Sequence, residues 1–247
     1  MSRVIGSNSH GNRNELKLVE EIDKKQFSQL NNNLKEFIRF IANDNNIDLS
    51  NNPVLHANYE SNTRLKQDLY VDINNHTFSI SLKMGSGNSV HQEKCEDFIS
   101  YIKKEFNASE DICDDFRLFL WADGTLDGTG SLNKDEEGNI KCRFSAREFR
   151  KRYPSKYEKL QSFLETNKRP LIERFLFVGR HNSKVDYVYH GNVFDGYWLS
   201  TKDIIEINMK EANANSLHVG KLSLQSWNIS RKGTTEHKRG QLQVKYS

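Results

Sequence analysis

Two short segments with alternating apolar side chains, joined by a pair of asparagines, constrain the fold of this chain most. Residues 69–73 and residues 77–83 each place an apolar side chain at every second position. A period of two is typical of β-strands that bury one face. Asn74 and Asn75 suit a tight turn between the two strands, because asparagine tolerates the left-handed backbone of such turns. We therefore predict a β-hairpin here.

Helical and strand-like segments surround this hairpin and indicate an α/β fold. Apolar residues at helical spacing predict helices before the hairpin, directly after it and beyond the middle of the chain. Short alternating segments in the last third predict further strands, the last ones antiparallel. No repeat or linker divides the chain, so we expect one domain over residues 1–247, with a catalytic core in residues 1–110 and the recognition part and remaining sheet in residues 111–247. The predicted helices cover residues 15–27, 30–41, 90–105 and 146–167, residues 171–178 form a helix or a strand, and the later strands cover residues 185–189, 197–200, 217–224 and 242–245.

Composition excludes several classes of protein. Cys95, Cys113 and Cys142 lie far apart and form no Cys-x-x-Cys pair, so we expect reduced thiols rather than a disulfide framework or a structural zinc site. No apolar run of the sequence approaches the roughly 18–20 residues that a membrane-spanning helix needs. The first ten residues lack the apolar core of a secretion signal, so we expect a cytoplasmic protein.

The formal net charge of +3 says little by itself, but the basic residues are concentrated in the C-terminal half. Residues 141–184 are rich in lysine and arginine, and in residues 221–245 only Glu236 opposes the basic side chains. Such a distribution favours an anionic partner, and nucleic acid is the usual one. A solvated basic face is the alternative interpretation.

Three polar residues of the hairpin suit the chemistry of phosphodiester hydrolysis. Asp68 stands at the start of the first strand, and Ser81 and Lys83 are two positions apart on the second strand, so both point to one face. A carboxylate can hold Mg²⁺ against a phosphate, because this ion prefers hard oxygen ligands. A lysine beside the ion can orient the attacking water or neutralise charge on the phosphate. The pattern is short, and an exposed hairpin without a site is the alternative.

The stretch from Asp68 to Lys83 has an acidic helix before it and a glycine-rich turn and a helix after it, and it resembles the core of the PD-(D/E)xK nucleases. Ser81 occupies the position at which that family commonly has Glu, Asp or Gln. The resemblance implies a restriction-endonuclease-like α/β core, in which helices flank a mixed central sheet. It also implies Mg²⁺ as the cofactor and catalytic roles for Asp68, Ser81 and Lys83, with Asp68 as a metal ligand.

The order of the remaining segments is similar to that of the MspI-like group of small restriction enzymes, including its GCGC-cutting members. The corresponding stretches are residues 165–169, residues 231–233 and residues 242–245. This resemblance implies a type II restriction endonuclease that cuts double-stranded DNA and reads it with a C-terminal antiparallel β lobe. It also implies a cognate DNA methyltransferase in the same system, and it leaves open whether the enzyme acts as a monomer or a homodimer. A different PD-(D/E)xK nuclease, for repair or phage DNA, and a non-catalytic DNA-binding or structural protein are the alternatives.

Since serine is a weaker metal ligand than a carboxylate, we expect another acid to complete the metal site. Glu93 is the first candidate, because it lies in the first turn of the helix expected after the glycine-rich turn. Glu96 and Asp97 lie slightly further along the chain, and Glu15 on the first predicted helix is a further candidate.

Two polar stretches are the candidates for contact with DNA. The turn after Lys83 has small residues that permit close approach to phosphate, followed by amide side chains that suit base edges. The C-terminal hairpin alternates polar and apolar residues, and a two-stranded ribbon fits the major groove. An ordinary turn and a half-buried edge hairpin are the alternative interpretations. The candidates in the turn are Ser86, Asn88, Ser89, His91 and Gln92, and those in the hairpin are Arg231, Lys232, Gln241, Gln243 and Lys245.

Overall fold

The computed structural model describes residues 9–84, 89–130, 145–210, 216–226 and 239–246, and it contains two compact units. The first unit comprises Met1–Gly87 and Phe177–Ile204, and the second comprises Asn88–Leu176 and Ile205–Ser247. The chain passes between the units three times, after residues 87, 176 and 204.

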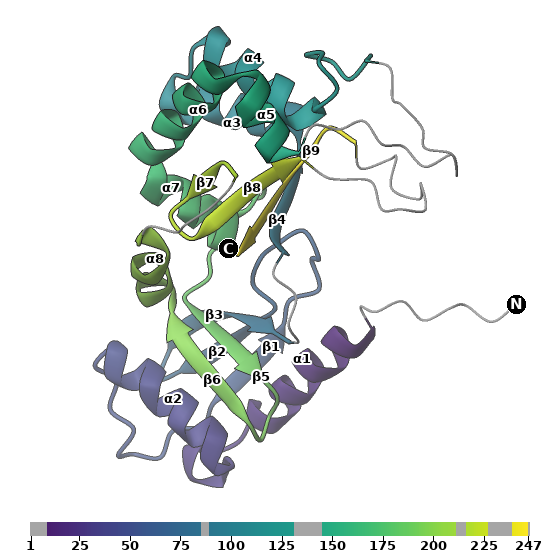
Figure 1. Ribbon diagram of the computed structural model, residues 1–247. Coiled ribbons are helices and arrows are strands. Elements are labelled where there is room, and N and C mark those ends of the chain that lie inside the picture. The colour runs from purple at the N-terminus through teal and green to yellow at the C-terminus, as the bar shows by residue number, and fades with distance from the viewer. Residues whose placement is uncertain (1–8, 85–88, 131–144, 211–215, 227–238, 247) are drawn as a thin grey trace, which may run out of the picture. The chain divides into compact units, whose positions relative to one another are not determined.

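The first unit is built around a five-stranded sheet (Figure 1). Its elements are α1 (Ser9–Ile22), the short 3-10 helix η1 (Phe27–Gln29), α2 (Asn32–Asp44), β1 (His56–Tyr59), β2 (Leu69–Ile73), β3 (His76–Lys83), β5 (Tyr187–Gly191) and β6 (Gly196–Ser200). The strand order is β1-β2-β3-β5-β6, in which β3 and β5 run parallel and the other neighbours run antiparallel. The predicted mixed sheet is therefore confirmed, and β5 and β6 are the late strands expected near residues 185–189 and 197–200.

The predicted hairpin is formed by β2 and β3. Ile73 pairs with His76, so Asn74 and Asn75 make a two-residue turn. Both asparagines have a positive φ, of 46° and 66° respectively. Two successive residues in this conformation are characteristic of the type I′ turn, which matches the twist of a hairpin.

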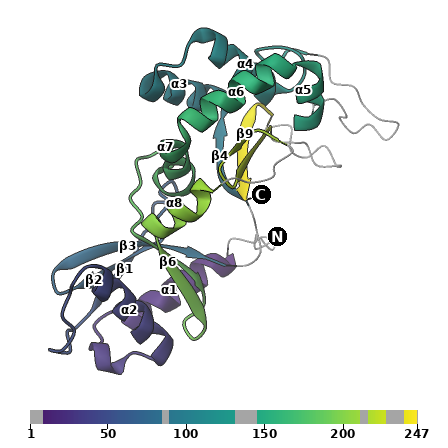
Figure 2. The same ribbon diagram turned by 60° about the vertical axis from the view of Figure 1, so that its left-hand side comes forward.

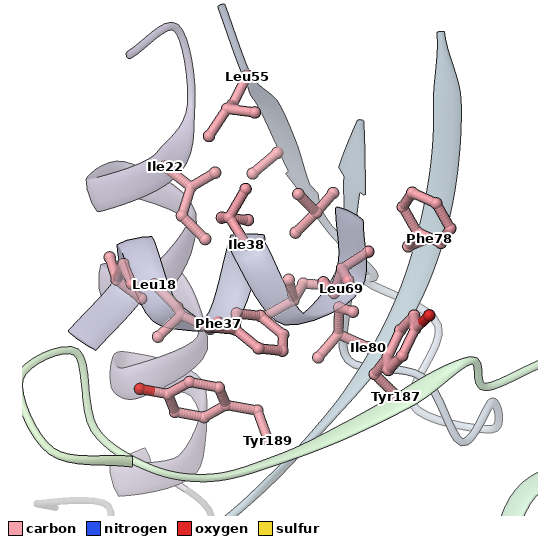
Figure 3. Packing of buried hydrophobic residues seen from close by; sticks show 14 of the residues in the cluster. Leu18, Ile22, Phe37, Ile38, Leu55, Leu69, Phe78, Ile80, Tyr187 and Tyr189 are labelled. Atoms are coloured by element: carbon pink, nitrogen blue, oxygen red, sulfur yellow. The ribbon is translucent and has the colours of Figure 1, made fainter. Parts of the chain in front are cut away.

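Side chains of α1 and α2 fill one face of this sheet (Figure 3). Leu18 of α1 and Phe37 of α2 pack in one apolar cluster with Leu69 of β2 and Ile80 of β3. Each large side chain buried in this way contributes about 1.5–3 kcal/mol relative to exposure. Because side chains alternate along a strand, Ser81 lies on the other face of β3. The residues predicted to form the site and the apolar core therefore occupy opposite faces of the sheet.

The second unit combines a four-stranded antiparallel sheet with a group of helices (Figure 2). Its elements are β4 (Ser89–Lys94), α3 (Cys95–Phe106), α4 (Glu110–Trp121), α5 (Ala146–Arg152), α6 (Pro154–Thr166), α7 (Lys168–Glu173), β7 (His218–Val219), β8 (Leu222–Ser226) and β9 (Gln241–Tyr246). A π-helical turn, η2 (Arg174–Val178), and α8 (Thr201–Met209) extend across the boundary between the units. The strand order is β4-β9-β8-β7, and α3 and α4 pack against the sheet.

Two predictions for this unit are corrected. The helix expected from residue 90 starts only at Cys95, because residues 89–94 form β4 and satisfy their backbone groups by pairing with β9. The helix expected over residues 146–167 is divided at Pro154, which lacks a backbone N–H and opens α6. Residues 171–178, for which helix and strand stood open, are helical throughout.

Two expectations from composition can be compared with the structure. Among the described residues, the helices are too short or too polar to span a bilayer. Cys95 and Cys113 are buried and free, as predicted, whereas Cys142 lies outside the described residues.

Candidate functional site

The carboxylate of Asp68 is held against β3 by hydrogen bonds. The backbone N–H of Asp68 donates to the carbonyl of Ile80 over 2.8 Å, which fixes the residue at the entrance of β2. Its Oδ2 atom accepts hydrogen bonds from the Ser81 hydroxyl (3.1 Å) and from the Leu82 backbone N–H (2.6 Å). Its Oδ1 atom accepts no hydrogen bond from the described residues. One oxygen of Asp68 is thus occupied by the protein and the other is available to a ligand.

Lys83 approaches the same carboxylate oxygen. Its Nζ atom lies 3.8 Å from Oδ2 of Asp68, and its side chain is 56 % exposed. Ser81 and Lys83 therefore lie on the same face of β3, as their spacing predicted, and both point to Asp68. The structure brings these three predicted residues together.

Burial raises the pKa of Asp68 above its ordinary value, and the charge of Lys83 and the hydrogen bonds from Leu82 and Ser81 oppose this rise only in part. The charge of Lys66 acts in the same direction as that of Lys83. At neutral pH, the ionised form of Asp68 is therefore under-compensated in the protein alone.

Glu15 of α1 is the second carboxylate of the site. Burial raises its pKa, and the negative charge of Asp68 raises it further, whereas Lys83 and a hydrogen bond from the Tyr59 hydroxyl lower it. The middle of α1 is fixed to the sheet, because the Asn14 amide donates to the Gly191 carbonyl at the end of β5 over 2.9 Å. Of the four candidate acids, Glu15 is the one that interacts with Asp68 and Lys83.

The interpretation of Glu93 as a metal ligand is corrected by its surroundings in the second unit. The Glu93 side chain is fully buried, and its Oε2 atom lies 2.6 Å from the guanidinium of Arg174. Its Oε1 atom is 2.9 Å from Nε2 of His91. Burial by itself raises the pKa of Glu93, but the hydrogen bonds and charges of His91 and Arg174 hold it below its ordinary value. The carboxylate is already compensated and has no oxygen left for a metal ion.

His91 is corrected for the same reason. Its side chain is 3 % exposed, contacts Glu93 and packs against the ring of Phe175. The prediction that it contacts DNA therefore does not hold. Glu96, whose side chain is largely exposed, forms an ion pair with the mostly buried Arg117, and Asp97 also belongs to α3. Both acids therefore belong to the second unit, whereas the hairpin belongs to the first.

The remaining DNA-reading candidates fall into two groups. Ser86, Asn88, Arg231 and Lys232 lie outside the described residues. Ser89, Gln92, Gln241, Gln243 and Lys245 lie on β4 and β9, which pair with each other. Leu242 and Val244 are fully buried, so the predicted alternation of β9 is confirmed.

Lys66 and His190 belong to the surroundings of the site but were not among the predicted residues. Lys66 precedes Asp68 by two positions, and its charge lowers the pKa of that residue. His190 is in register with Lys83 across the parallel β3–β5 pair, and its ring stacks on Tyr197 with centroids 4.7 Å apart. Lys66 could have been found from the sequence, because it lies only two residues from Asp68. His190 could not, because the pairing of β5 with β3 that brings it beside Lys83 is not evident from the sequence.

The two carboxylates fit a hard divalent cation better than a zinc-like ion. Among the described residues, no group of three or more His, Cys, Asp or Glu side chains could hold a metal ion. Mg²⁺ commonly uses one or two carboxylates and completes its shell with water and substrate phosphate. The free Oδ1 atom of Asp68 and the carboxylate of Glu15 match this demand.

The fold is similar to that of a solved restriction enzyme. The crystal structure of the restriction endonuclease MspI in complex with its cognate DNA matches 98 % of this chain and 93 % of its own, with a TM-score of 0.59 and 13 % sequence identity. No protein-family model matches the sequence, and no curated protein matches it. The chain thus has a restriction-endonuclease-like fold, in which helices flank a mixed sheet and an antiparallel sheet is added.

We expect Asp68→Asn to raise the thermal unfolding midpoint of the metal-free protein at neutral pH. Because the pKa of Asp68 is raised in the folded state, the protonated side chain favours folding. This contribution to stability is complete below the ordinary pKa of Asp68 and is lost as the pH rises through its folded-state pKa. Asparagine keeps an acceptor for Ser81 and Leu82 without the charge. A gain of about 1 kcal/mol would appear as a rise of roughly 2–4 °C by calorimetry in EDTA, and it should vanish in acid.

Asp186 provides a matched control for this substitution. Its Oδ2 atom also accepts from a backbone N–H and a hydroxyl, both of Ser79, over 2.9 and 2.7 Å, and it pairs with Lys184 at 3.4 Å. Asp186→Asn loses that ion pair, so it should give no gain in stability. An equal rise in both variants would contradict the electrostatic explanation.

The buried pair of Glu93 and Arg174 should be structural. Arg174→Met leaves a buried carboxylate without its guanidinium partner, and we expect the free energy of unfolding to fall by about 3–5 kcal/mol. The double variant Glu93→Gln/Arg174→Met should recover part of this loss. Glu96→Gln, which breaks the partly exposed pair with Arg117, should cost less than about 1 kcal/mol. Urea unfolding measures all three, and similar small losses throughout would refute the structural role.

Proposed function

We propose that this chain is a type II restriction endonuclease that hydrolyses phosphodiester bonds of double-stranded DNA at a specific sequence with Mg²⁺. The observation that carries the proposal is the cluster of Asp68, Ser81 and Lys83 with Glu15. It lies in a fold that is similar, over nearly its whole length, to a restriction enzyme solved with DNA. The proposal includes the MspI-like group, a cytoplasmic location, and a methyltransferase of the same system that protects the host DNA.

Asp68 and Glu15 would hold the metal ion. Both have a raised pKa, so a divalent cation would relieve the mutual repulsion and the desolvation of two partly buried carboxylates. When bound, such an ion lowers the pKa of coordinated water and neutralises charge on the scissile phosphate. Ser81 is unsuited to replace a carboxylate ligand, and its hydroxyl instead orients Asp68 by donating to Oδ2.

Lys83 supplies the positive charge of the site. Its ammonium group is near Asp68 yet more than half exposed, so it can donate both to a water molecule and to a phosphate oxygen. In these positions it orients the attacking water and stabilises the charge that develops on the phosphate. Lys66, two residues before Asp68 in the sequence, adds a second positive charge that acts on this carboxylate. The positive charges of Lys66 and Lys83 offset the negative charges of the two carboxylates. A polyanion such as DNA can therefore approach the site.

The antiparallel sheet of the second unit would read the DNA. Gln241, Gln243 and Lys245 alternate with the buried residues of β9. Glutamine presents a donor and an acceptor to base edges, and lysine contacts guanine or phosphate. These groups supply sequence preference, while the metal site supplies the chemistry.

Incubation of supercoiled plasmid with the purified chain tests the proposal. With Mg²⁺ we expect discrete bands, and with EDTA no cleavage. Asp68→Asn and Lys83→Ala should cut scarcely at all and still bind the plasmid in Ca²⁺, because neither carries the recognition groups. A smear would indicate a nuclease without sequence preference, and absence of cleavage with every divalent cation would refute the enzyme.

We expect Glu15→Gln to weaken metal binding specifically. The Mg²⁺ concentration for half-maximal cleavage should rise at least about tenfold, which corresponds to about 1.4 kcal/mol. Glu20→Gln is the matched control, since Glu20 is an exposed acid on the same helix. Titration of the cleavage rate with Mg²⁺ measures both variants. If the two titrations coincide with that of the unaltered chain, Glu15 is not a ligand.

A further inference from the structure

Three glutamines form a row across neighbouring strands of the second unit. Gln92 of β4 pairs with Gln243 of β9, and Gln243 pairs with Gln225 of β8. Residues that pair across strands point to the same face of a sheet. The register thus adds Gln225, on the strand that pairs with β9, to two glutamines that the sequence alone had already suggested.

Among the described residues, the row lies on the face of the sheet opposite to the side chains that are buried in the unit. The neighbours of these glutamines along the strands are buried: His91 and Glu93 on β4, Leu242 and Val244 on β9, and Leu224 on β8. Gln92 is exposed, and Gln225 and Gln243 are half-buried. One face of the sheet therefore supports the unit and the other presents a line of amides.

The surroundings of the row suit an anionic, hydrogen-bonding partner. Lys94 and Lys245 lie on the same face, with Ser89 and Ser223. None of the described strand residues on this face is a carboxylate. Lysines beside amides match a surface of phosphates and base edges, and a carboxylate would repel it.

The amide of Gln225 is free to bind a ligand. The Nε2 atoms of Gln92 and Gln243 both lie 3.3 Å from the Ser89 hydroxyl, which ties them to each other. The side chain of Gln225 forms no hydrogen bond with any described residue, since its strand pairing involves the backbone alone. A half-buried amide gains most from a partner that satisfies both its donor and its acceptor.

We propose that Gln225 is a base-reading residue and that the row of Gln92, Gln243 and Gln225 addresses a window of about four consecutive base pairs. Adjacent strands lie about 4.8 Å apart, so the outer two glutamines are about 10 Å apart. Base pairs repeat every 3.4 Å or so, which makes about three steps. The proposal rests on the proposed function only in its partner, double-stranded DNA. It adds Gln225 to the proposed recognition surface, together with the alignment of three glutamines across neighbouring strands.

Selection from a random duplex library in Ca²⁺ tests this without requiring cleavage. The bound duplexes are sequenced for the unaltered chain, Gln225→Ala and Gln225→Glu. Gln225→Ala should lower the preference at one base pair by between about 5-fold and about 150-fold and leave the other positions unchanged. Gln225→Glu should shift the preference at that position toward cytosine, because a carboxylate accepts from the cytosine amino group. A purely structural residue would not cause such a change of base.

Lys94→Ala is the control on the same face. It removes a phosphate-type contact, so it should weaken binding to all duplexes equally and keep the selected sequence. The base position relaxed by Gln225→Ala should lie within three base pairs of those relaxed by Gln92→Ala and Gln243→Ala.

Two outcomes would overturn the inference. One is an unchanged selected sequence with both Gln225 variants. The other is a loss of affinity that is equal for selected and scrambled duplexes, as for Lys94→Ala. A chain that selects a sequence but never cuts would refute the enzyme and leave the reading row intact, so the two proposals fail separately.

Discussion

The parallel pairing of β3 with β5 is the constraint on which the first unit depends. It places Tyr187 and Tyr189 beside Ile80 and Leu82, so the late strand completes the apolar face that α1 and α2 cover. On the other face, the same pairing sets Val188 beside Ser81 and His190 beside Lys83. A single register thus fixes both the core and the site. A slip by one residue would exchange the two faces, which the buried tyrosines prevent.

The site is electrostatically unfavourable in the protein alone, and this is informative about its use. Burial raises the pKa of both Asp68 and Glu15, and the negative charge of Asp68 raises the pKa of Glu15 further. Lys83 compensates only partly, since it is exposed and 3.8 Å from Asp68. A carboxylate kept for stability would be paired in the way of Glu93, with a guanidinium at 2.6 Å and a pKa held low. Under-compensated acids beside the hairpin and a compensated acid at Glu93 are what we expect if the first pair is kept to bind a cation and the second to stabilise the fold.

The local parts of this structure could be predicted from the sequence, and the non-local parts could not. The hairpin with Asp68, Ser81 and Lys83 was found because its period of two and its asparagine turn are encoded within a few residues. The choice of Glu93 failed because residues 89–94 continue as a strand, and because its partner Arg174 lies 81 positions away. Glu15 stood only among the alternatives, since the approach of α1 to the hairpin depends on contacts such as that of Asn14 with Gly191.

The buried pair of Glu93 and Arg174 has a consequence for the proposed recognition surface, although it lies outside the proposed metal site. On β4, Glu93 points into the unit and Gln92 points out of it, one position apart. If the register of β4 slipped by one residue, a charged carboxylate would face outward and a glutamine would be buried without a partner. The ion pair has a single geometry, closed by His91 on one side and by the Tyr101 ring, 3.7 Å from the guanidinium, on the other. A buried charge pair contributes little net stability, yet it can select one arrangement over its neighbours. Here that arrangement is the one that aligns Gln92 with Gln243 and Gln225, so the ion pair beneath the sheet helps to specify the face that we propose to read DNA.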